Sequence, residues 1–372
     1  MRIGFDAKRA FFNNTGLGNY SRDTINILSH YEKNNQYFLF TPKLIQNERV
    51  NFSSNENIKI CAPHSIKDKL FSSYWRSYGC IKNLISNNLD LFHGLSNEIP
   101  FGIEKTNIKS VVTIHDLIFL RYPKLFNIVD RKIYYKKFKS SCKRANKIIA
   151  ISKQTKQDII DFFSINEEKI KVVYQGCNTI FKSKLMQKER EAIINKYKLP
   201  KSFILYVGTI EERKNLMSLL QAVNKINNIN LVVIGNGKSY KEKCLEYIKK
   251  NKINSKVFIL NNVSFNDIPA IYQSADMMVY PSFFEGFGIP IIEALYSKTP
   301  VITTKGGCFE EAGGPDTIYV NSKSVRDLKE SIESLYLNKD KREKMKINGI
   351  KFAQKFSDDK IANNLFKVYK NI

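Results

Sequence analysis

Short runs of β-branched and aromatic residues alternate with amphipathic helical patterns along most of the chain. Runs of this kind at this spacing are typical of βαβ units, which build parallel sheets. The helical patterns between them include Asn19–Tyr31 and Lys153–Phe163. We therefore expect short strands at Arg2–Asp6, Tyr37–Phe40, Ile58–Cys61, Leu89–Phe92, Ser110–Ile114, Lys147–Ile151, Lys171–Tyr174, Ser202–Val207, Asn230–Ile234, Lys256–Leu260, Met277–Tyr280, Pro300–Thr303 and Thr317–Val320.

The pattern pauses once, in the polar and helix-poor stretch Gln175–Lys184, and then starts again. A series of strands on each side of this linker predicts an α/β protein with two doubly wound parallel sheets. We expect an N-terminal Rossmann-like domain at 1–178 and a C-terminal one at 179–352. No strand pattern returns after Ser322, and we expect residues 353–372 to form a helix that packs back on the first domain.

Composition fits two folded domains. The chain has 372 residues, of which 43% are hydrophobic and 26% are charged, and these values exclude a disordered chain. The longest stretch without a charged residue is 12 residues, whereas a membrane-spanning helix needs about 18. Because Asp6 stands where a signal peptide would be apolar, we expect a cytoplasmic protein. The six cysteines fit no zinc or disulfide framework, so we expect buried thiols.

The net charge of +25 is concentrated in one segment more than elsewhere. Between Arg121 and Lys147 there are ten Lys or Arg residues and one acidic residue, Asp130. Such a segment can bind phospholipid headgroups or nucleic acid, or it can be a solvated helix face. No RNP, KH or zinc-finger pattern accompanies it, so we favour anionic lipid of the inner membrane over nucleic acid. The lysines expected at this membrane and acceptor surface are Lys132, Lys136, Lys137 and Lys139.

The most informative loop is Pro281–Glu293, which follows an expected strand and opens a helix at Pro290. Gly286 and Gly288 let the backbone come close to a ligand. Amides at a helix N-terminus point outward and bind anions or hydroxyls, and here they belong to Phe287, Gly288 and Ile289. The loop therefore predicts a cradle for a polar ligand.

Two carboxylates flank this cradle. Glu285 precedes it and Glu293 lies about one turn inside the helix, so both could bind hydroxyls of one ligand. Carboxylates that accept from vicinal hydroxyls are a common way to hold a ribose or a hexose. The alternative is a capped helix with two solvated acids.

A second loop, Gly208–Asn215, also leads from a strand through glycine towards a helix. Its adjacent cations, Arg213 and Lys214, stand where the helix dipole favours acidic residues. A bound diphosphate would explain them, because a leaving group that develops negative charge needs fixed positive partners. Taken alone, however, adjacent cations on a surface often bind nothing.

Two further features are weaker. His115 ends the expected strand Ser110–Ile114, at the sheet edge where catalytic groups collect, although a structural role is an equal alternative. Gly16 and Gly18 form a G-x-G turn that could be a diphosphate or acceptor loop. Like the Gly235–Gly237 turn, it lacks the third glycine of a dinucleotide fingerprint.

Together these motifs resemble those of retaining glycosyltransferases of the GT-B fold, family 4, and in particular the bacterial polysaccharide mannosyltransferase branch. The resemblance spans nearly the whole chain and is carried by Glu285 to Glu293 (E-x7-E), Gly208–Asn215, Thr113–Leu117 and Ile149–Ser152. It implies two Rossmann-like domains that face each other across a cleft. It also implies hexosyl transfer, with GDP-mannose as the leading donor, to a saccharide or polyprenyl-diphosphate-linked acceptor in surface polysaccharide synthesis.

The resemblance also implies roles for the motif residues. By this resemblance, Glu285 and the amides of Phe287–Ile289 would contact the donor hexose and its phosphate, and Glu293 would hold the ribose. Arg213 and Lys214 would bind the diphosphate. His115 would lie at the reaction centre. The chain departs from many relatives at Thr209, where they carry an Arg after the glycine. Arg213 would then have to supply that charge.

We expect neither a metal nor another cofactor. The chain has no D-x-D pair, through which the other common glycosyltransferase fold binds a divalent ion, and the two cations and a helix N-terminus would replace that ion. By resemblance, retention proceeds on one face of the sugar, and Glu285 is not a nucleophile. The alternatives are transfer from a UDP-, ADP- or dTDP-sugar, another GT-B enzyme such as an epimerase or phosphorylase, and a basic nucleic-acid-binding protein.

Overall fold

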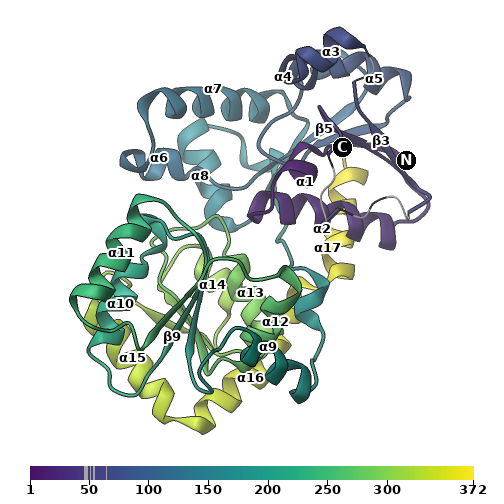
Figure 1. The fold of residues 1–372 in the computed structure, drawn as a ribbon. Helices are drawn as coiled ribbons and strands as arrows, with labels where there is room; N and C mark the ends of the chain where they lie inside the picture. Colours follow the sequence, from purple (N-terminus) through teal and green to yellow (C-terminus); the bar gives the residue numbers. More distant parts are fainter. Residues whose placement is uncertain (46–48, 51, 53–54, 64) are drawn as a thin grey trace. The chain divides into compact units, whose positions relative to one another are not determined.

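The chain divides into two compact units (Figure 1). The computed structural model describes residues 1–45, 49–50, 52, 55–63 and 65–372. Unit 1 consists of Met1–Gly176 and Phe356–Ile372, and unit 2 is Cys177–Lys355. One division therefore falls within the expected linker and the other within the expected terminal segment.

Unit 1 is built on a parallel sheet with the strand order β3-β2-β1-β4-β5-β6-β7. The order reverses between β1 and β4, and α-helices lie between most successive strands, although none of the described residues between β2 and β3 is helical. The strands are β1 (Arg2–Asp6), β2 (Gln36–Phe40), β3 (Ile58–Cys61), β4 (Leu91–Gly94), β5 (Lys109–Ile114), β6 (Lys147–Ala150) and β7 (Ile170–Val172). The helices are α1 (Lys8–Phe12), α2 (Gly16–Tyr31), α3 (Ile66–Leu70), α4 (Ser72–Tyr74), α5 (Cys80–Ser86), α6 (Ile118–Arg121), α7 (Ile128–Arg144), α8 (Lys153–Phe163) and α17 (Asp358–Lys370).

Unit 2 repeats this plan with the strand order β10-β9-β8-β11-β12-β13, again all parallel. Its strands are β8 (Ile204–Val207), β9 (Leu231–Ile234), β10 (Val257–Leu260), β11 (Met277–Tyr280), β12 (Val301–Thr304) and β13 (Ile318–Val320). Its helices are α9 (Gln187–Lys196), α10 (Leu216–Asn224), α11 (Ser239–Lys250), α12 (Ile268–Ser274), α13 (Ile289–Tyr296), α14 (Cys308–Gly313), α15 (Val325–Leu337) and α16 (Lys339–Ala353).

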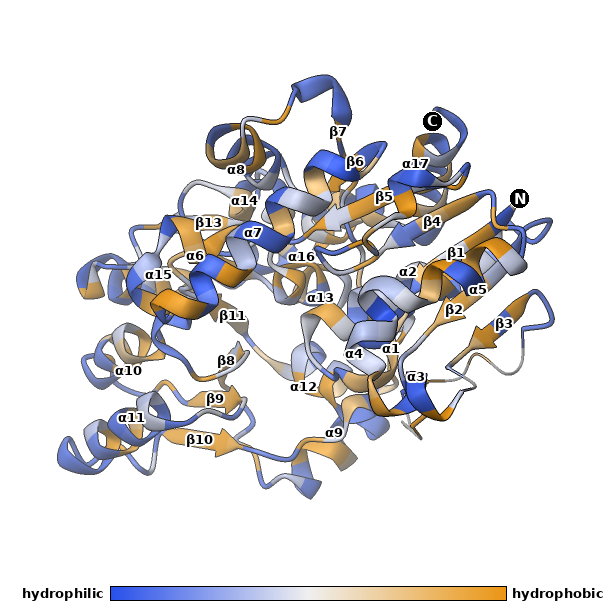
Figure 2. Ribbon diagram, turned by 90° about the horizontal axis from the view of Figure 1, so that it is seen from above, coloured by the Kyte–Doolittle hydropathy of each residue, from blue (hydrophilic) through white to orange (hydrophobic). Residues whose placement is uncertain are grey.

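The central strands of unit 2 are hydrophobic along their whole length. Every residue of β9 and of β11 is buried, and Figure 2 shows strands that are mostly orange beside helices with blue outer faces. Parallel strands read this way because helices cover both faces of the sheet. The prediction of two doubly wound sheets is confirmed.

Strand β4 corrects one sequence prediction. We expected Leu89–Phe92, but the strand is Leu91–Gly94. Asp90 lies outside it because its carboxylate accepts the Arg2 amide at 2.7 Å, and the strand continues through the polar His93, whose ring is fully buried. Because His93 is polar, the hydrophobic run ends at Phe92, two residues before the end of the strand.

All six cysteines are free thiols, and five of them are buried. In the part of the chain that the structure describes, no helix is both long enough and apolar enough to cross a membrane.

Candidate active site

Two strand-to-helix loops lie side by side at the carboxyl edge of the unit 2 sheet. Strand β8 continues through Gly208 into a 3-10 turn at Glu212–Lys214, and β11 continues through Glu285 to α13. β8 and β11 are neighbours at the point where the strand order reverses. Doubly wound sheets bind ligands at this position.

Backbone contacts fasten the two loops together. The Phe283 amide donates to the Arg213 carbonyl at 2.8 Å. Asn215, with a φ of 56°, donates its side-chain amide to the Pro281 carbonyl at 3.2 Å. The cations of one loop are thereby held in place against the carboxylate of the other.

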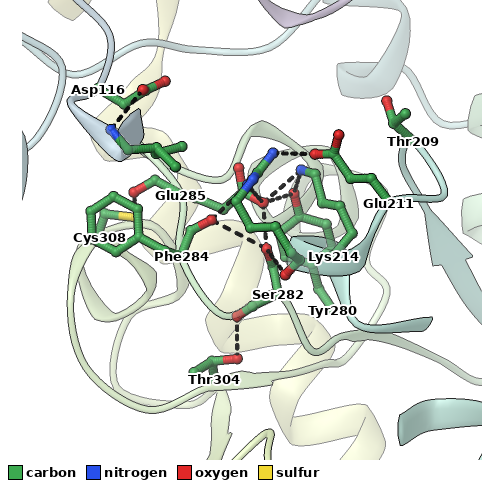
Figure 3. A network of polar contacts seen from close by, with 12 residues as sticks. Asp116, Thr209, Glu211, Lys214, Tyr280, Ser282, Phe284, Glu285, Thr304 and Cys308 are labelled. Atoms are coloured by element: carbon green, nitrogen blue, oxygen red, sulfur yellow. Dashed lines mark hydrogen bonds and ion pairs between the residues drawn. The ribbon is translucent and has the colours of Figure 1, made fainter. Parts of the chain in front are cut away.

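Glu285 is the centre of a buried polar cluster (Figure 3). Arg213 Nη1 and Lys214 Nζ lie 2.7 and 2.6 Å from its Oε1. The hydroxyls of Ser282 and Tyr280 donate to the same oxygen at 2.6 and 3.0 Å, and Lys214 also donates to the Tyr280 hydroxyl. Because all four contacts converge on Oε1, Oε2 is the oxygen that could accept a ligand hydroxyl.

The pKa values of the charged groups in this cluster are shifted from their ordinary values. Burial would raise the pKa of Glu285, but Lys214 and Arg213 outweigh it and lower that pKa to about 2. Burial lowers the pKa of Lys214 in spite of the nearby carboxylate. Burial also opposes the charge on Arg213, yet Glu285 and Glu211 overcome it and raise its pKa. At neutral pH the Glu285 carboxylate is therefore ionised.

The sequence argument for Arg213 and Lys214 was incomplete. It explained the two cations by a bound diphosphate and did not include Glu285, which pairs with both of them in the structure. Arg213 also pairs with Glu211 at 2.5 Å, and the Glu211 side chain is 43% exposed. Of the two carboxylate partners of Arg213, Glu211 is thus the more exposed.

The glycine loop before α13 has an unusual backbone. Gly288 has a φ of +104° and is the N-cap of the helix, which begins at Ile289, one residue before the expected start at Pro290. The amides of Gly288 and Ile289 precede the first intrahelical hydrogen bond. Gly286, Phe287 and Gly288 are buried, and Ile289 is half-buried.

Glu293 lies apart from the Glu285 contacts. It sits in α13, and its Oε2 accepts the hydroxyl of Tyr272, on α12, at 2.9 Å. Both residues are buried. The tyrosine orients the carboxylate, a contact that the spacing of the two glutamates could not reveal.

His115 follows β5 in unit 1 and is buried. Its amide donates to Asn97 Oδ1 at 2.9 Å, and its Nε2 lies 2.8 Å from the carbonyl of Leu95. Burial lowers the pKa of His115 to about 4, so the ring is neutral at physiological pH. Since a carbonyl can only accept, Nε2 carries the proton and Nδ1 has a free lone pair.

The G-x-G segments have packing roles. α2 begins at Gly16, so Gly16 and Gly18 lie in its first turn rather than in a preceding turn as expected. A Cβ on Gly18 would lie 1.7 Å from the Asn13 carbonyl oxygen, so glycine permits the contact with the preceding loop. Gly235 similarly lies against the Gly208 carbonyl, where a Cβ would approach to 2.0 Å.

The four lysines of α7 are not equivalent. Lys132 and Lys136 are exposed, whereas Lys137 pairs with Glu98 at 3.3 Å and Lys139 donates to the Tyr135 hydroxyl at 2.8 Å. The aromatic residues Phe126, Tyr135 and Phe138 pack against the core of unit 1. Other apolar residues of this region are exposed, namely Tyr122, Leu125, Ile128, Val129, Ile133 and Tyr134.

Sequence reasoning missed the residues that orient the candidate groups. Tyr280, at the end of β11, and Ser282, in the loop, precede Glu285 closely in the sequence, so their nearness was available as a signal. Tyr272 comes from another helix, and its contact depends on tertiary packing. Among the described residues, no group of three or more His, Cys, Asp or Glu side chains is placed to hold a metal ion.

Comparison with known families places both units. Residues 187–352 match the family described as glycosyl transferases group 1, and residues 26–181 match glycosyltransferase family 4. The first match lies in unit 2 and the second lies in unit 1 except for residues 177–181, and together they span most of the chain. The chain belongs to glycosyltransferase family 4. Its two parallel sheets with their helices have the GT-B fold. The protein is therefore an enzyme, a glycosyltransferase.

Several relatives are similar to this family 4 glycosyltransferase. The O-antigen chain mannosyltransferase RfbU of Salmonella typhimurium is 30% identical over 228 residues, which cover 60% of each chain. The O-antigen chain mannosyltransferase B of Escherichia coli is 26% identical over 75% of this chain and 74% of its own. The crystal structure of Anabaena HepE with UDP and glucose has a TM-score of 0.74 at 16% identity, over 100% of this chain and 99% of its own.

Proposed function

We propose that this enzyme transfers a mannosyl group from GDP-mannose, with retention of configuration, to a saccharide or polyprenyl-diphosphate-linked acceptor in surface polysaccharide synthesis. The observation that carries this proposal is the buried Glu285 carboxylate, held by Arg213 and Lys214 at the switch point of the unit 2 sheet. The choice of mannose follows the two O-antigen mannosyltransferases among its relatives.

The cations would bind the donor diphosphate. Arg213 and Lys214 are already ordered by Glu285, so little side-chain entropy is lost when a phosphate arrives. The phosphate would displace Glu211, whose side chain is the more exposed partner of Arg213. This exchange trades a screened surface pair for a charge-assisted contact with the ligand. Arg213 would thereby supply the charge that is missing at Thr209.

The remaining groups would position the sugar nucleotide. Glu285 Oε2 and the amides of Phe287–Ile289 would bind the hexose and its phosphate, and Glu293 would bind the ribose. His115 would contribute its Nδ1 at the reaction centre as a neutral acceptor. The leaving phosphate would take the acceptor proton, so no step needs Glu285 as a nucleophile.

A thermal-shift panel tests the donor. Purified enzyme is heated with GDP-mannose, GDP, and UDP-, ADP- and dTDP-sugars, because a ligand that binds the folded state raises its apparent stability. We expect the largest rise with GDP-mannose. A rise with UDP-sugars and none with GDP-sugars would refute mannosyl transfer from GDP-mannose. It would favour the second candidate, transfer from a UDP-sugar. The observation behind this candidate is that the structural neighbour HepE was crystallised with UDP and glucose.

We also propose that α7 and its approach bind the anionic inner membrane, where a polyprenyl-linked acceptor would lie. Lys132 and Lys136 are exposed beside Ile128, Val129 and Ile133, and the exposed fraction of Ile128 is 66%. Exposed apolar side chains among lysines suit an interfacial helix. Each lysine near an anionic surface contributes about 1 kcal/mol, and salt screens this attraction.

A further inference from the structure

A chain of buried polar side chains runs through unit 1 and ends beside His115. The Tyr369 hydroxyl, on α17, lies 2.6 Å from Nδ1 of His93, on β4. His93 Nε2 lies 2.8 Å from the hydroxyl of Thr113, on β5. The Thr113 hydroxyl in turn lies 3.0 Å from that of Tyr20, on α2. All four residues are buried, so these hydrogen bonds are shielded from water.

The hydrogen bonds of this chain have one consistent direction. Burial lowers the pKa of His93 to about 3, so its ring carries a single proton. In the part of the chain that the structure describes, His93 is the hydrogen-bond partner of the Tyr369 hydroxyl, which therefore donates to Nδ1. His93 then donates from Nε2 to Thr113, and Thr113 donates to Tyr20. Tyr20 has the Thr24 hydroxyl as a further partner, so each member of the chain is satisfied.

The chain reaches His115 through a ring contact. The Tyr20 and His115 rings are 4.6 Å apart between centroids and nearly perpendicular, with an interplanar angle of 89°. The Leu95 carbonyl fixes Nε2 of His115 at 2.8 Å. The imidazole is thus oriented by one hydrogen bond and by the ring of Tyr20. Any change that lets Tyr20 rotate would loosen one of these two constraints.

We propose that Tyr369 and His93 are positioning residues for transfer, which hold the Tyr20 ring against His115 through Thr113. The C-terminal helix α17 would then be part of the catalytic apparatus, although it is distant from His115 in sequence. The contact between His93 and Tyr369 spans 276 residues. The proposal rests on the role proposed above for His115 at the reaction centre.

The test compares two tyrosine-to-phenylalanine variants in unit 1. Tyr369→Phe removes the first donor of the chain. Tyr37→Phe is the matched control, because Tyr37 is also buried, but its hydroxyl donates to the Leu28 carbonyl at 2.8 Å. We expect Tyr369→Phe to lower kcat about tenfold with donor KM within twofold, since small misplacements of reacting groups act on turnover. Tyr37→Phe should leave kcat within twofold even if its Tm falls equally.

A second pair of variants gives a rescue. Thr113→Val breaks the chain and should lower kcat like Tyr369→Phe, whereas Thr113→Ser keeps the hydroxyl and should restore most of the rate. Equal kcat losses in Tyr369→Phe and Tyr37→Phe, or no difference between Val and Ser at Thr113, would overturn the positioning role. His115→Ala separates the two proposals. If it abolishes turnover while Tyr369→Phe behaves like its control, only the positioning role fails; if it leaves turnover intact, the proposed role of His115 itself is wrong.

Discussion

Replacing Glu285 with Gln should destabilise unit 2 and also lower the enzyme's activity. The change keeps the size of the side chain but removes the charge that Arg213 and Lys214 share. Its amide would also bring two N–H donors towards groups that already donate. Removing one partner of a buried ion pair leaves an uncompensated charge, which typically costs about 3 to 5 kcal/mol.

The lowered pKa of Glu285 gives a second figure for the free energy by which its ionised form stabilises the fold. A change from the ordinary 4.5 to about 2 corresponds to about 3 kcal/mol, because a tenfold change in an equilibrium constant is about 1.4 kcal/mol. Since the folded-state pKa lies below the unfolded one, this stabilisation is present above pH 4.5 and is lost as pH falls through about 2. Loss of the proton from Lys214, whose pKa is already lowered, would limit the cost in the variant.

The assay is urea unfolding at neutral pH, followed by circular dichroism and by tryptophan emission. The single tryptophan, Trp75, lies in unit 1 and reports that unit alone. Glu211→Gln is the control, since Glu211 pairs with the same Arg213 but is 43% exposed, and exposed pairs contribute about 1 kcal/mol at most. Equal free energies of unfolding for the two variants would refute the idea that Glu285 is a buried structural charge. Glu211→Gln should also leave donor affinity unchanged or slightly improved.

Three further predictions concern donor, turnover and membrane. Glu293→Ala should weaken donor binding by about 1 to 3 kcal/mol in calorimetry, as expected for a lost charge-assisted hydrogen bond, and wild-type affinity would show that the ribose lies elsewhere. His115→Ala should lower initial rates more than donor affinity, because a group at the reacting centre acts on the transition state; equal losses would make it an ordinary contact. Lys132→Glu with Lys136→Glu should abolish salt-sensitive flotation with phosphatidylglycerol vesicles. The same charge reversal at the exposed lysines 249–250 should leave flotation unchanged. Unchanged flotation of the Lys132 and Lys136 variant would exclude α7 as the membrane-binding segment.

The sequence predicted the strands and loops well because these depend on local patterns. Strand β11 lies where its hydrophobic run was, and the two loops at the switch point followed from the strand order. Contacts between distant segments carry no local signal. Arg213 pairs with Glu285, on another loop, and sequence adjacency gave no reason to connect these two residues.

Buried polar residues were the main source of error. The expected strand ended at Phe92, whereas β4 continues through His93, whose two ring nitrogens are both hydrogen-bonded inside unit 1. Only the fold brings Tyr369 to it from the other end of the chain. Polar residues in a core can be predicted only together with their partners, and those partners are set by topology.

The division of the chain also sets an order of assembly during synthesis. Unit 1 is discontinuous, because α17 is translated only after all of unit 2. At about 5 to 20 residues per second, the ribosome needs about 10 to 40 s to travel from Gly176 to Tyr369. Throughout that interval His93, on β4, lacks the Tyr369 hydroxyl as a partner. The nascent chain must therefore complete its second unit before its first, and a chain that stops before α17 leaves unit 1 without the helix that carries Tyr369.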